Sequence, residues 1–174
     1  AKGAYGRTRL ATELACRAQL GASPERLVVA RLPETFGPLS PGQLGILGGI
    51  AQARFRLIGR GHALHHMSTV GDVVRGLVAC AERNAAQGET LNLGSAPRTL
   101  RAFVAAAEAA FGRSVRDTPL AELPALAALR LMRASPALAR GLGGLFSTLD
   151  YQLRPRAYAV ARSVSALGAY QLDD

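Results

Sequence analysis

One short apolar segment limits the folds open to this chain more than any other feature. It reads Leu27-Val28-Val29-Ala30-Arg31-Leu32, and the turn signal Ser23-Pro24 precedes it. A run of this length, apolar on both faces and β-branched at its centre, is typical of a strand buried in a parallel sheet. Pro33 and a stretch rich in Pro and Gly from 36 to 42 then predict a loop. We therefore expect residues 27–32 to form an inner strand of a parallel sheet.

Helical and extended patterns alternate along the rest of the chain. Residues 5–20 predict a helix, because Leu10, Leu14 and Ala18 recur at intervals of four and Gly21 is placed to end it. Further helices are expected at 45–53, 72–84 and 99–111, strands at 55–58 and 89–93, and two or three shorter helices after Pro119 that begin near Pro124 and Pro136. The tail from Asp150 on is weakly patterned. The alternation favours the α/β class.

Local signals also predict the ends and the buried faces of two helices. Asp72 suits the N-cap of helix 72–84, where a carboxylate accepts a backbone N–H, and Thr99 suits the N-cap of the next helix. Gly112 is expected to end that helix. The predicted core faces are Val73, Val74, Leu77, Val78 and Ala81 in the first helix, and Leu100, Phe103, Val104, Ala107 and Phe111 in the second.

Charge and composition narrow the choice of partners. The chain has 21 basic and 12 acidic residues and a formal net charge of +9. The basic residues are scattered, and no basic stripe is interleaved with aromatic side chains, so we expect no nucleic-acid partner. An anionic small molecule accounts for the excess charge equally well.

The sequence also predicts where the protein works. No apolar run reaches the roughly 20 residues that a membrane-spanning helix needs. The chain opens Ala1-Lys2-Gly3 with no secretory leader and no initiator Met, so we expect the first residue to be a cut. Cys16 and Cys80 lie in apolar helical patterns and are expected to be buried thiols in a reducing compartment. A cytoplasmic location is therefore predicted.

The first helix carries a residue pair that could perform chemistry. Tyr5 and Arg9 are four residues apart and so share one helix face. A fixed cation beside a phenol favours the phenolate form, which suits a tyrosine to general acid/base catalysis. Spacing alone leaves open a simple surface pair of Tyr and Arg.

The interpretation of this pair also depends on two longer sequence segments, one of which contains the pair. The first is Tyr5-Gly6-Arg7-Thr8-Arg9-Leu10-Ala11-Thr12-Glu13. The second is Ala30-Arg31-Leu32-Pro33-Glu34-Thr35-Phe36-Gly37-Pro38, which contains the end of the predicted strand and the loop after it.

Two further segments follow in order. One combines Ile58-Gly59-Arg60-Gly61 with Met67-Ser68-Thr69-Val70-Gly71-Asp72-Val73, and the other is Glu89-Thr90-Leu91-Asn92-Leu93-Gly94-Ser95 followed by Thr99-Leu100. In this order and spacing, the four segments resemble the extended short-chain dehydrogenase/reductase superfamily, the NAD-dependent epimerase/dehydratase family. The resemblance covers roughly residues 5–112.

The resemblance implies a fold and a division of the chain. The fold is an α/β one: the C-terminal half of a Rossmann-like doubly wound parallel sheet with a small, mostly helical substrate-binding region. Residues 1–58 would be the C-terminal part of the NAD(P)-binding domain. Residues 59–174 would be mainly the substrate-binding region, with interleaved Rossmann elements. The chain is thus expected to be a fragment that lacks the nucleotide phosphate loop and the upstream catalytic Ser/Thr.

The resemblance also implies roles for named residues. Tyr5 would be the catalytic acid/base and Arg9 would replace the family's lysine beside the nicotinamide ribose. Tyr5, Arg9, Pro33, Glu34 and Thr35 would bind the cofactor, NAD or NADP. The implied contacts to a small-molecule substrate are Glu34, His65 and Asn92.

Three departures from the family pattern bear on activity and substrate. Arg9 keeps the charge of lysine, but its planar guanidinium is larger and hydrogen-bonds differently. Glu34 stands where the family usually has Asn, which places a carboxylate near any anionic sugar nucleotide. His65 lies close to where many sugar-nucleotide members have a phosphate-binding Arg. Small molecules other than sugar nucleotides, reacting at a carbonyl or hydroxyl group, are therefore also candidate substrates.

Other patterns are interpreted as structural. Gly42-Gln43-Leu44-Gly45-Ile46-Leu47-Gly48 has the spacing of a phosphate loop, but a proline-rich loop and not a strand precedes it. Gly141-Leu142-Gly143-Gly144 is interpreted as a flexible linker. His62, His65 and His66 lack a second cluster of ligands, so no metal site is predicted.

The leading hypothesis is an NAD(P)-dependent oxidoreductase, epimerase or dehydratase that acts on a hydroxyl or carbonyl group, with a homodimer as one expected assembly of the complete protein. The isolated chain is expected to be inactive. The alternative is a non-catalytic Rossmann-like binding or scaffold module, which keeps the fold without the chemistry.

Overall fold

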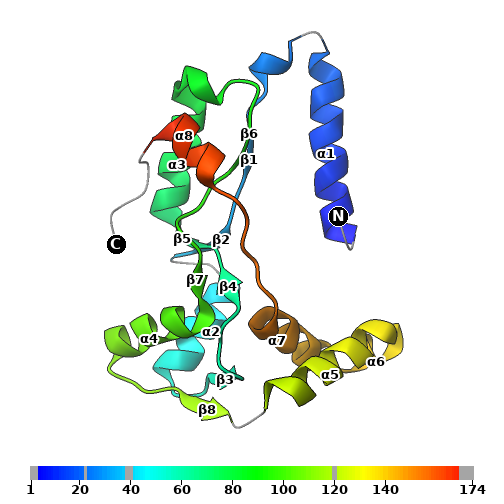
Figure 1. Cartoon of the computed structure of the whole chain (residues 1–174), viewed down its shortest axis with the longest axis vertical. Coiled ribbons are helices and arrows are strands. Elements are labelled where there is room, and N and C mark those ends of the chain that lie inside the picture. The colour runs from blue at the N-terminus through cyan, green and yellow to red at the C-terminus, as the bar shows by residue number, and fades with distance from the viewer. Residues whose placement is uncertain (1–3, 22, 38–40, 119–120, 169–174) are drawn as a thin grey trace. The chain divides into compact units, whose positions relative to one another are not determined.

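The computed structural model describes residues 4–21, 23–37, 41–118 and 121–168 (Figure 1). The chain divides into two compact units, and it passes between them more than once. Unit 1 comprises residues 1–33, 68–95 and 159–174, and unit 2 comprises residues 34–67 and 96–158. The predicted domain boundary at residue 58 stays a prediction, because compactness does not show which part binds which ligand.

Unit 1 is built on a pair of parallel strands. β1 (Val29–Arg31) pairs with β6 (Thr90–Asn92), and Ala30 lies opposite Leu91. In Figure 1, α1 lies on one side of this pair and α3 and α8 lie on the other. The remaining bounds are α1 Ala4–Leu20, η1 Pro24–Arg26, β5 Met67–Thr69, α3 Val70–Glu82, η2 Asn84–Ala86 and α8 Ala161–Leu167. The predicted parallel pairing is thus confirmed, whereas β1 is only partly buried and pairs with β6 alone among the described residues, so its inner position in a sheet stays a prediction.

The core of unit 1 lies on the α3 and α8 side of the strand pair. Its buried members are Ala79, Cys80, Ala86, Leu91, Leu93 and Leu167. By contrast, none of the α1 side chains is buried. Polar contacts join α1 to the strands instead: Arg31 donates to both carboxylate oxygens of Glu13, at 2.9 and 2.6 Å, and Arg17 donates to the hydroxyl of Thr90.

Unit 2 combines two small sheets with five helices of the described residues. β3 (Arg56–Ile58) pairs in parallel with β8 (Arg116–Thr118), and β4 (Leu64–His65) pairs antiparallel with β7 (Arg98–Thr99). The other bounds are β2 Glu34–Phe36, α2 Pro41–Ala51, α4 Leu100–Phe111, α5 Glu122–Ala134, α6 Pro136–Gly141 and α7 Gly143–Leu153.

Two apolar clusters form the core of unit 2. The first joins α2, β3 and α4 through Ile50, Leu57, Leu100, Val104 and Ala107. The second joins β3, α5 and α7 through Ile58, Ala125, Leu129, Met132 and Leu149. A glycine is required where β3 approaches α4: Gly61 has a φ of +66°, and a Cβ there would lie 3.0 Å from Cδ2 of Leu57.

Two of the three predicted helix ends, at Thr99 and Gly112, are confirmed, and the predicted N-cap at Asp72 is wrong. The Thr99 hydroxyl accepts the Ala102 N–H, and Gly112 ends α4 with a φ of 59°, as predicted. The N-cap of α3 is Thr69 and not Asp72. Thr69 Oγ1 accepts the Asp72 N–H and donates to the Asp72 carboxylate, so the two residues form a reciprocal cap.

The buried face of α3 was predicted wrongly. Val73 is buried, but Val74, Leu77 and Val78 are exposed, whereas Ala79 and Cys80 face the core. α3 is apolar on more than one side, and its contacts with α8 decide which side is covered. The prediction for Cys16 was also wrong, because this thiol on the sparsely packed α1 is exposed.

The remaining differences lie in the second half of the chain. Gly143 and Gly144 begin α7, so the segment predicted to be a flexible linker joins two helices directly. The weakly patterned tail contains α8. The predicted mixed α/β structure is confirmed. The strands of the described residues form sheets of two strands each, so a doubly wound sheet stays a prediction.

The fold predicts a contrast between two leucines of unit 2. Leu100→Ala should lower the free energy of unfolding by about 2–5 kcal/mol, because it opens a cavity at a fully buried position. Leu123→Ala, at a position that is 79% exposed, should change it by less than about 0.5 kcal/mol. Urea titration followed by circular dichroism measures both, and equal midpoint shifts would contradict the assigned core.

Candidate functional site

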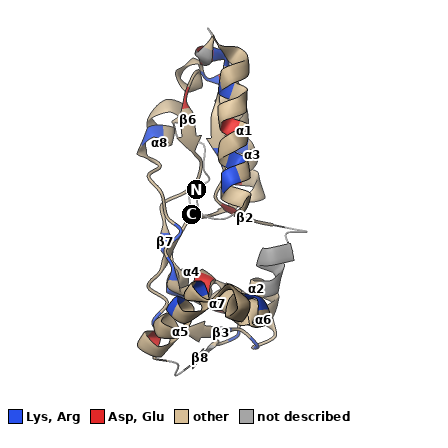
Figure 2. Cartoon of the chain, turned by 90° about the vertical axis from the view of Figure 1, so that its right-hand side faces the viewer, with Lys and Arg blue, Asp and Glu red and all other residues tan. Residues whose placement is uncertain are grey.

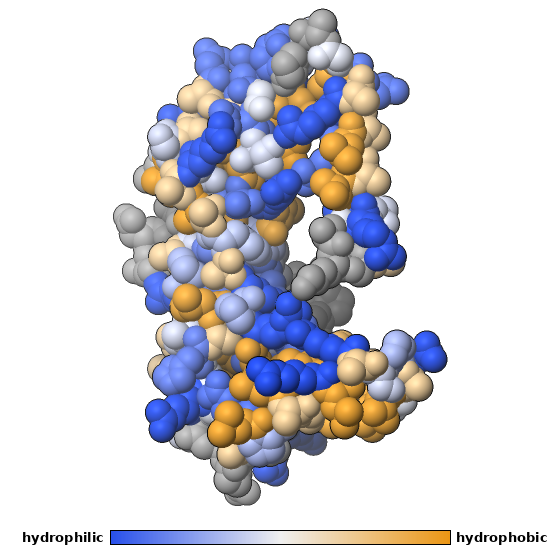
Figure 3. Space-filling view, turned by 45° about the vertical axis from the view of Figure 1, so that its right-hand side comes forward, coloured by the Kyte–Doolittle hydropathy of each residue, from blue (hydrophilic) through white to orange (hydrophobic). Residues whose placement is uncertain are grey.

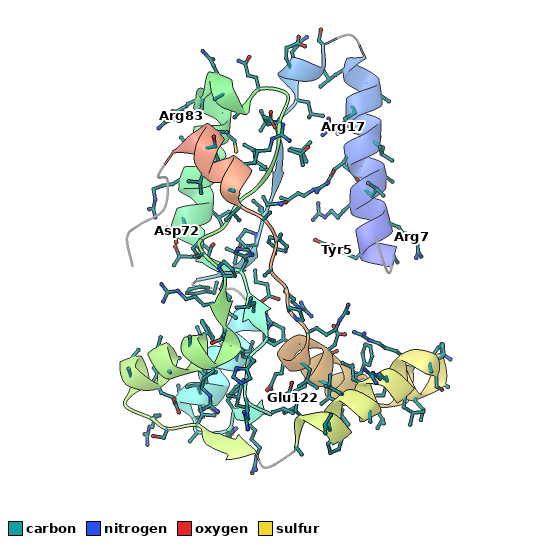
Figure 4. All side chains as sticks on the ribbon, in the orientation of Figure 1. Tyr5, Arg7, Arg17, Asp72, Arg83 and Glu122 are labelled. Atoms are coloured by element: carbon teal, nitrogen blue, oxygen red, sulfur yellow. The ribbon has the colours of Figure 1, made fainter. Side chains whose placement is uncertain are left out.

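The first two turns of α1 carry the predicted catalytic pair. The Nε–H of Arg9 donates to the Tyr5 hydroxyl at 3.2 Å, and the Arg9 guanidinium carbon lies 5.2 Å from the centre of the Tyr5 ring. Tyr5 is 75% exposed. Figure 4 shows Tyr5 and Arg7 projecting from different sides of the helix. The predicted contact between Tyr5 and Arg9 is therefore present, and the hydroxyl is accessible to a ligand.

An ion pair holds the helix that bears this pair beside β1. The hydrogen bond from Arg31 keeps the pKa of the Glu13 carboxyl below its usual range, and the same bond raises the pKa of Arg31. Glu13 lies two helical turns after Tyr5, so the attachment of α1 does not occupy the Tyr5 hydroxyl.

The predicted cofactor segment follows the carboxyl end of β1. Pro33 is buried, and Glu34 and Thr35 begin β2 and are half-buried. In open α/β sheets, ligands bind at the carboxyl ends of the parallel strands, so this segment is suitably placed in the chain for such a contact.

Glu34 is the centre of a polar cluster inside unit 2. Its Oε1 accepts from the Arg156 guanidinium at 3.0 Å, and its Oε2 accepts from the Tyr151 hydroxyl, also at 3.0 Å. The Arg156 guanidinium lies over the Tyr151 ring, 5.1 Å from its centre. We call Glu34, His65, Tyr151 and Arg156 the Glu34 cluster.

His65 completes the Glu34 cluster from β4. It is only 1% exposed, and its ring centre lies 4.8 Å from that of Tyr151. Its Nδ1 lies 3.6 Å from Oε2 of Glu34, slightly beyond hydrogen-bonding distance, and within the described residues neither ring nitrogen has a hydrogen-bond partner. Two predicted substrate contacts, Glu34 and His65, are thus brought together.

A second carboxylate extends this cluster toward the surface. Asp150 pairs with Arg133, with Arg154 at 3.2 Å and with Arg156 at 3.4 Å. Burial raises the pKa of Asp150, but hydrogen bonds from Arg133 and Arg154 outweigh it, and the pKa lies below its usual value. Arg156 is therefore held between two carboxylates.

The protonation of Glu34 follows from its neighbours. Burial by itself raises the pKa of this carboxyl, but the His65 imidazole, the Tyr151 hydroxyl and the charge of Arg156 together hold it below its usual value. Glu34 is thus a carboxylate at neutral pH, and Arg156 balances its charge.

Asn92 has a structural contact. Its side-chain amide donates to the Ala159 carbonyl at 3.0 Å, while the Ser163 hydroxyl donates to the Asn92 carbonyl at 2.6 Å. These bonds join β6 to α8 and to the segment that leads into it. The substrate contact of Asn92 stays a prediction.

Sequence reasoning missed Tyr151, Arg156 and Asp150. Tyr151 and Arg156 lie 117 and 122 residues after Glu34, in the tail that carries little periodicity. The one available signal was the unusual carboxylate at Glu34, because a half-buried carboxylate needs a cationic partner.

An open apolar cavity of about 470 Å³ lies in unit 1 between β1 and α3. Its walls include Val28, Ala30, Leu77 and Cys80. Burial raises the pKa of the Cys80 thiol, so it is a packing group and not an activated nucleophile.

The described residues do not support metal or membrane-spanning roles. Among them, no group of three His, Cys, Asp or Glu side chains could hold a metal ion, and no helix has the length and apolarity to cross a bilayer. The glycine pattern at 42–48 lies within α2, so it does not form a phosphate loop. Basic residues lie on many elements and do not gather on one (Figure 2).

Comparisons with solved structures find close similarity of fold. An epimerase from the methanogen Methanothermobacter thermautotrophicus matches 96% of this chain with a TM-score of 0.64 and 18% identity, over 45% of its own length. A human epimerase family protein solved with NADPH matches 91% of this chain with a TM-score of 0.64 and 20% identity, over 48% of its length.

A UDP-glucuronic acid 4-epimerase from Bacillus cereus, solved with UDP-glucuronic acid and NAD, matches 95% of this chain at 17% identity, with a TM-score of 0.55 and over 51% of its length. The chain has the fold of the extended short-chain dehydrogenases. It spans about half the length of these structures. No protein-family model matches the chain, and no curated protein matches its sequence.

The Glu34 cluster predicts a pH-dependent contribution to stability. Glu34→Gln should lower the free energy of unfolding by about 1 kcal/mol at pH 7, a value reduced for the partial exposure of Arg156. Because the folded-state pKa of Glu34 is depressed, this difference is present above the unfolded pKa of about 4.3 and is lost as pH falls through the folded pKa.

Urea titrations between pH 7 and pH 3 measure this difference. Glu82→Gln, at an exposed position of α3, serves as the control and should change stability little at any pH. A pH-independent difference for Glu34→Gln would contradict the electrostatic role of the cluster.

Proposed function

We propose that this chain carries the catalytic tyrosine and part of the substrate-binding region of an NAD(P)-dependent oxidoreductase, epimerase or dehydratase. The substrate would be a small molecule that reacts at a hydroxyl or carbonyl group. The contact between Tyr5 and Arg9 carries the proposal, in a chain that has the fold of NAD- and NADPH-binding epimerases. Because the chain spans about half of those proteins, the proposal concerns the complete protein.

The chemistry assigned to α1 is the transfer of a proton. The Tyr5 hydroxyl gives a proton to a substrate carbonyl oxygen and becomes a phenolate, or, in the reverse direction, the Tyr5 phenolate takes a proton from a substrate hydroxyl. In both directions Arg9 stabilises the phenolate form. The nicotinamide cofactor, when bound, accepts or supplies a hydride. The exposure of Tyr5 fits a group that must reach both ligands.

The remaining predicted contacts keep their assigned roles. Pro33, Glu34 and Thr35 would lie near the cofactor, and Glu34, His65 and Asn92 near the substrate. An unpaired carboxylate at Glu34 would repel an anionic substrate, but Arg156 balances its charge. A sugar nucleotide therefore stays among the candidate substrates. A cytoplasmic location and a homodimer of the complete protein stay predictions.

A non-catalytic module with the same fold is the second candidate, and the arginine at position 9 favours it. Arginine contributes a charge but lacks the compact ammonium group of the family's lysine. Activity measurements on variants of α1 separate the two candidates.

Tyr5→Phe should leave the fold intact and lower turnover of the complete enzyme roughly 10²–10⁴-fold, because only the acid/base hydroxyl is removed. Arg9→Lys should retain or raise activity and shift the pH–rate profile, whereas Arg9→Met should depress turnover and cofactor binding. Arg7→Met is the matched control on the other side of α1 and should change neither. If turnover is unchanged in Tyr5→Phe and Arg9→Met, the catalytic role of this pair is excluded and the non-catalytic module is the remaining candidate.

The chain by itself should bind NAD and NADP only weakly. Its glycine pattern at 42–48 lies in α2 and cannot supply the backbone N–H groups that hold a pyrophosphate at a helix N-terminus. Calorimetric titration of each dinucleotide into the 174-residue chain tests this. A micromolar dissociation constant would refute the view that the phosphate loop lies elsewhere.

A further inference from the structure

Polar contacts attach α1, the helix of the Tyr5 and Arg9 pair, to the strands of unit 1. None of its side chains is buried, and hydrophobic residues lie at its surface (Figure 3). Among the described residues, the side-chain hydrogen bonds that link α1 to the strands are those of Glu13 with Arg31 and of Arg17 with Thr90. Within this chain, α1 therefore depends on these contacts to stay beside the strands.

The contact between Tyr5 and Arg9 requires α1 to be helical. The two residues are four positions apart, and helical spacing is what puts their side chains on one face. Most helices in proteins gain their stability from tertiary contacts, and α1 also lacks an acidic residue in its first turn to favour the helix dipole. Contacts that hold α1 therefore also keep the catalytic pair together.

The ion pair of Glu13 with Arg31 is the more directional of the two attachments. Arg31 donates from two different nitrogens to the two carboxylate oxygens, at 2.9 and 2.6 Å, and two such bonds fix the orientation of both groups. Tyr5, Arg9 and Glu13 recur at intervals of four, so they lie along one side of α1. Figure 4 shows Tyr5 projecting from the side of α1 where the strands lie. The ion pair thus turns this side of the helix toward β1.

Arg31 also lies at the end of the strands where ligands bind in α/β sheets. It is the last residue of β1, and its backbone carbonyl accepts the N–H of Leu93 at 2.9 Å, directly after the end of β6. Ligands bind beyond the carboxyl ends of parallel strands. Pro33, which begins the predicted cofactor segment, follows two residues later. The ion pair therefore sets the position of α1 relative to these strand ends.

We propose that Glu13 and Arg31 are positioning residues for the acid/base Tyr5. Their ion pair keeps α1 helical and holds its Tyr5 side toward the strand ends, so that the hydroxyl meets the reacting group of the substrate. Neither residue takes part in the proton transfer itself, and Arg17 adds to the attachment one turn further on. This inference rests on the function proposed for Tyr5.

Hydrogen exchange measured by mass spectrometry tests the attachment on the 174-residue chain. Glu13→Gln and Arg31→Gln should each make peptides from residues 4–20 exchange about two- to fivefold faster, the effect expected of a partly exposed ion pair. Peptides from α3 should be unchanged. Glu82→Gln is the matched control, at an exposed position outside α1, and should exchange as the parent chain does.

Turnover of the complete enzyme tests the positioning role. With NAD or NADP and the substrate on which Tyr5→Phe is inactive, Glu13→Gln and Arg31→Gln should lower kcat about 10- to 100-fold, because small displacements of a catalytic group have effects of this size. KM should change far less. Arg31→Lys keeps the charge but loses the second bond, so its effect should be smaller. Exchanging the charges, Glu13→Arg with Arg31→Glu, should recover most of the lost kcat.

The outcomes separate this inference from the proposed function. If Tyr5→Phe is inactive while Glu13→Gln and Arg31→Gln turn over as the parent does, the proposed function stands and the inference is wrong. If Tyr5→Phe keeps its turnover, the proposed function is wrong and the positioning role falls with it. Unchanged exchange of α1, or equally faster exchange of α1 and α3, would also overturn the inference, because the pair would then not act on α1 specifically.

Discussion

The ion pair between Glu34 and Arg156 organises unit 2. The Arg156 backbone also pairs with β4, because its N–H donates to the Leu64 carbonyl at 2.7 Å and its carbonyl accepts the His66 N–H at 3.1 Å. Its side chain meets Glu34 from β2 and Asp150 from α7. One residue near the end of the chain thus joins three elements that are distant in sequence. Burying a carboxylate is costly, and this pairing offsets the cost.

The candidate catalytic helix is attached in a different way. α1 buries no side chain, and the ion pair from Glu13 to Arg31 with the bond from Arg17 to Thr90 holds it beside the strands. Exposed ion pairs contribute little stability, so α1 is expected to be among the less stable parts of the described chain. Such a position keeps Tyr5 accessible, which an acid/base residue needs.

Local signals predicted the elements well, because their physical causes lie within a few residues. The helix at 4–20, the cap at Thr99 and the stop at Gly112 follow from periodicity, side-chain acceptors and left-handed backbone. The contact from Arg9 to Tyr5 follows in the same way from helical spacing. Errors arose where packing decides. The exposed side of α3 and the exposed Cys16 depend on which elements lie against each helix.

The sequence by itself determined the alternation of strands and helices, the face that Tyr5 shares with Arg9, and a resemblance to epimerases whose mixed α/β fold the chain shares. These properties depend on backbone periodicity and on short motifs, which a linear pattern records. Only the tertiary structure decided that Glu34 is neutralised by Arg156, that His65 is buried against Tyr151 and that Glu13 pairs with Arg31. Each of these depends on contacts between residues far apart in the chain, and such contacts leave no periodic signal in the sequence.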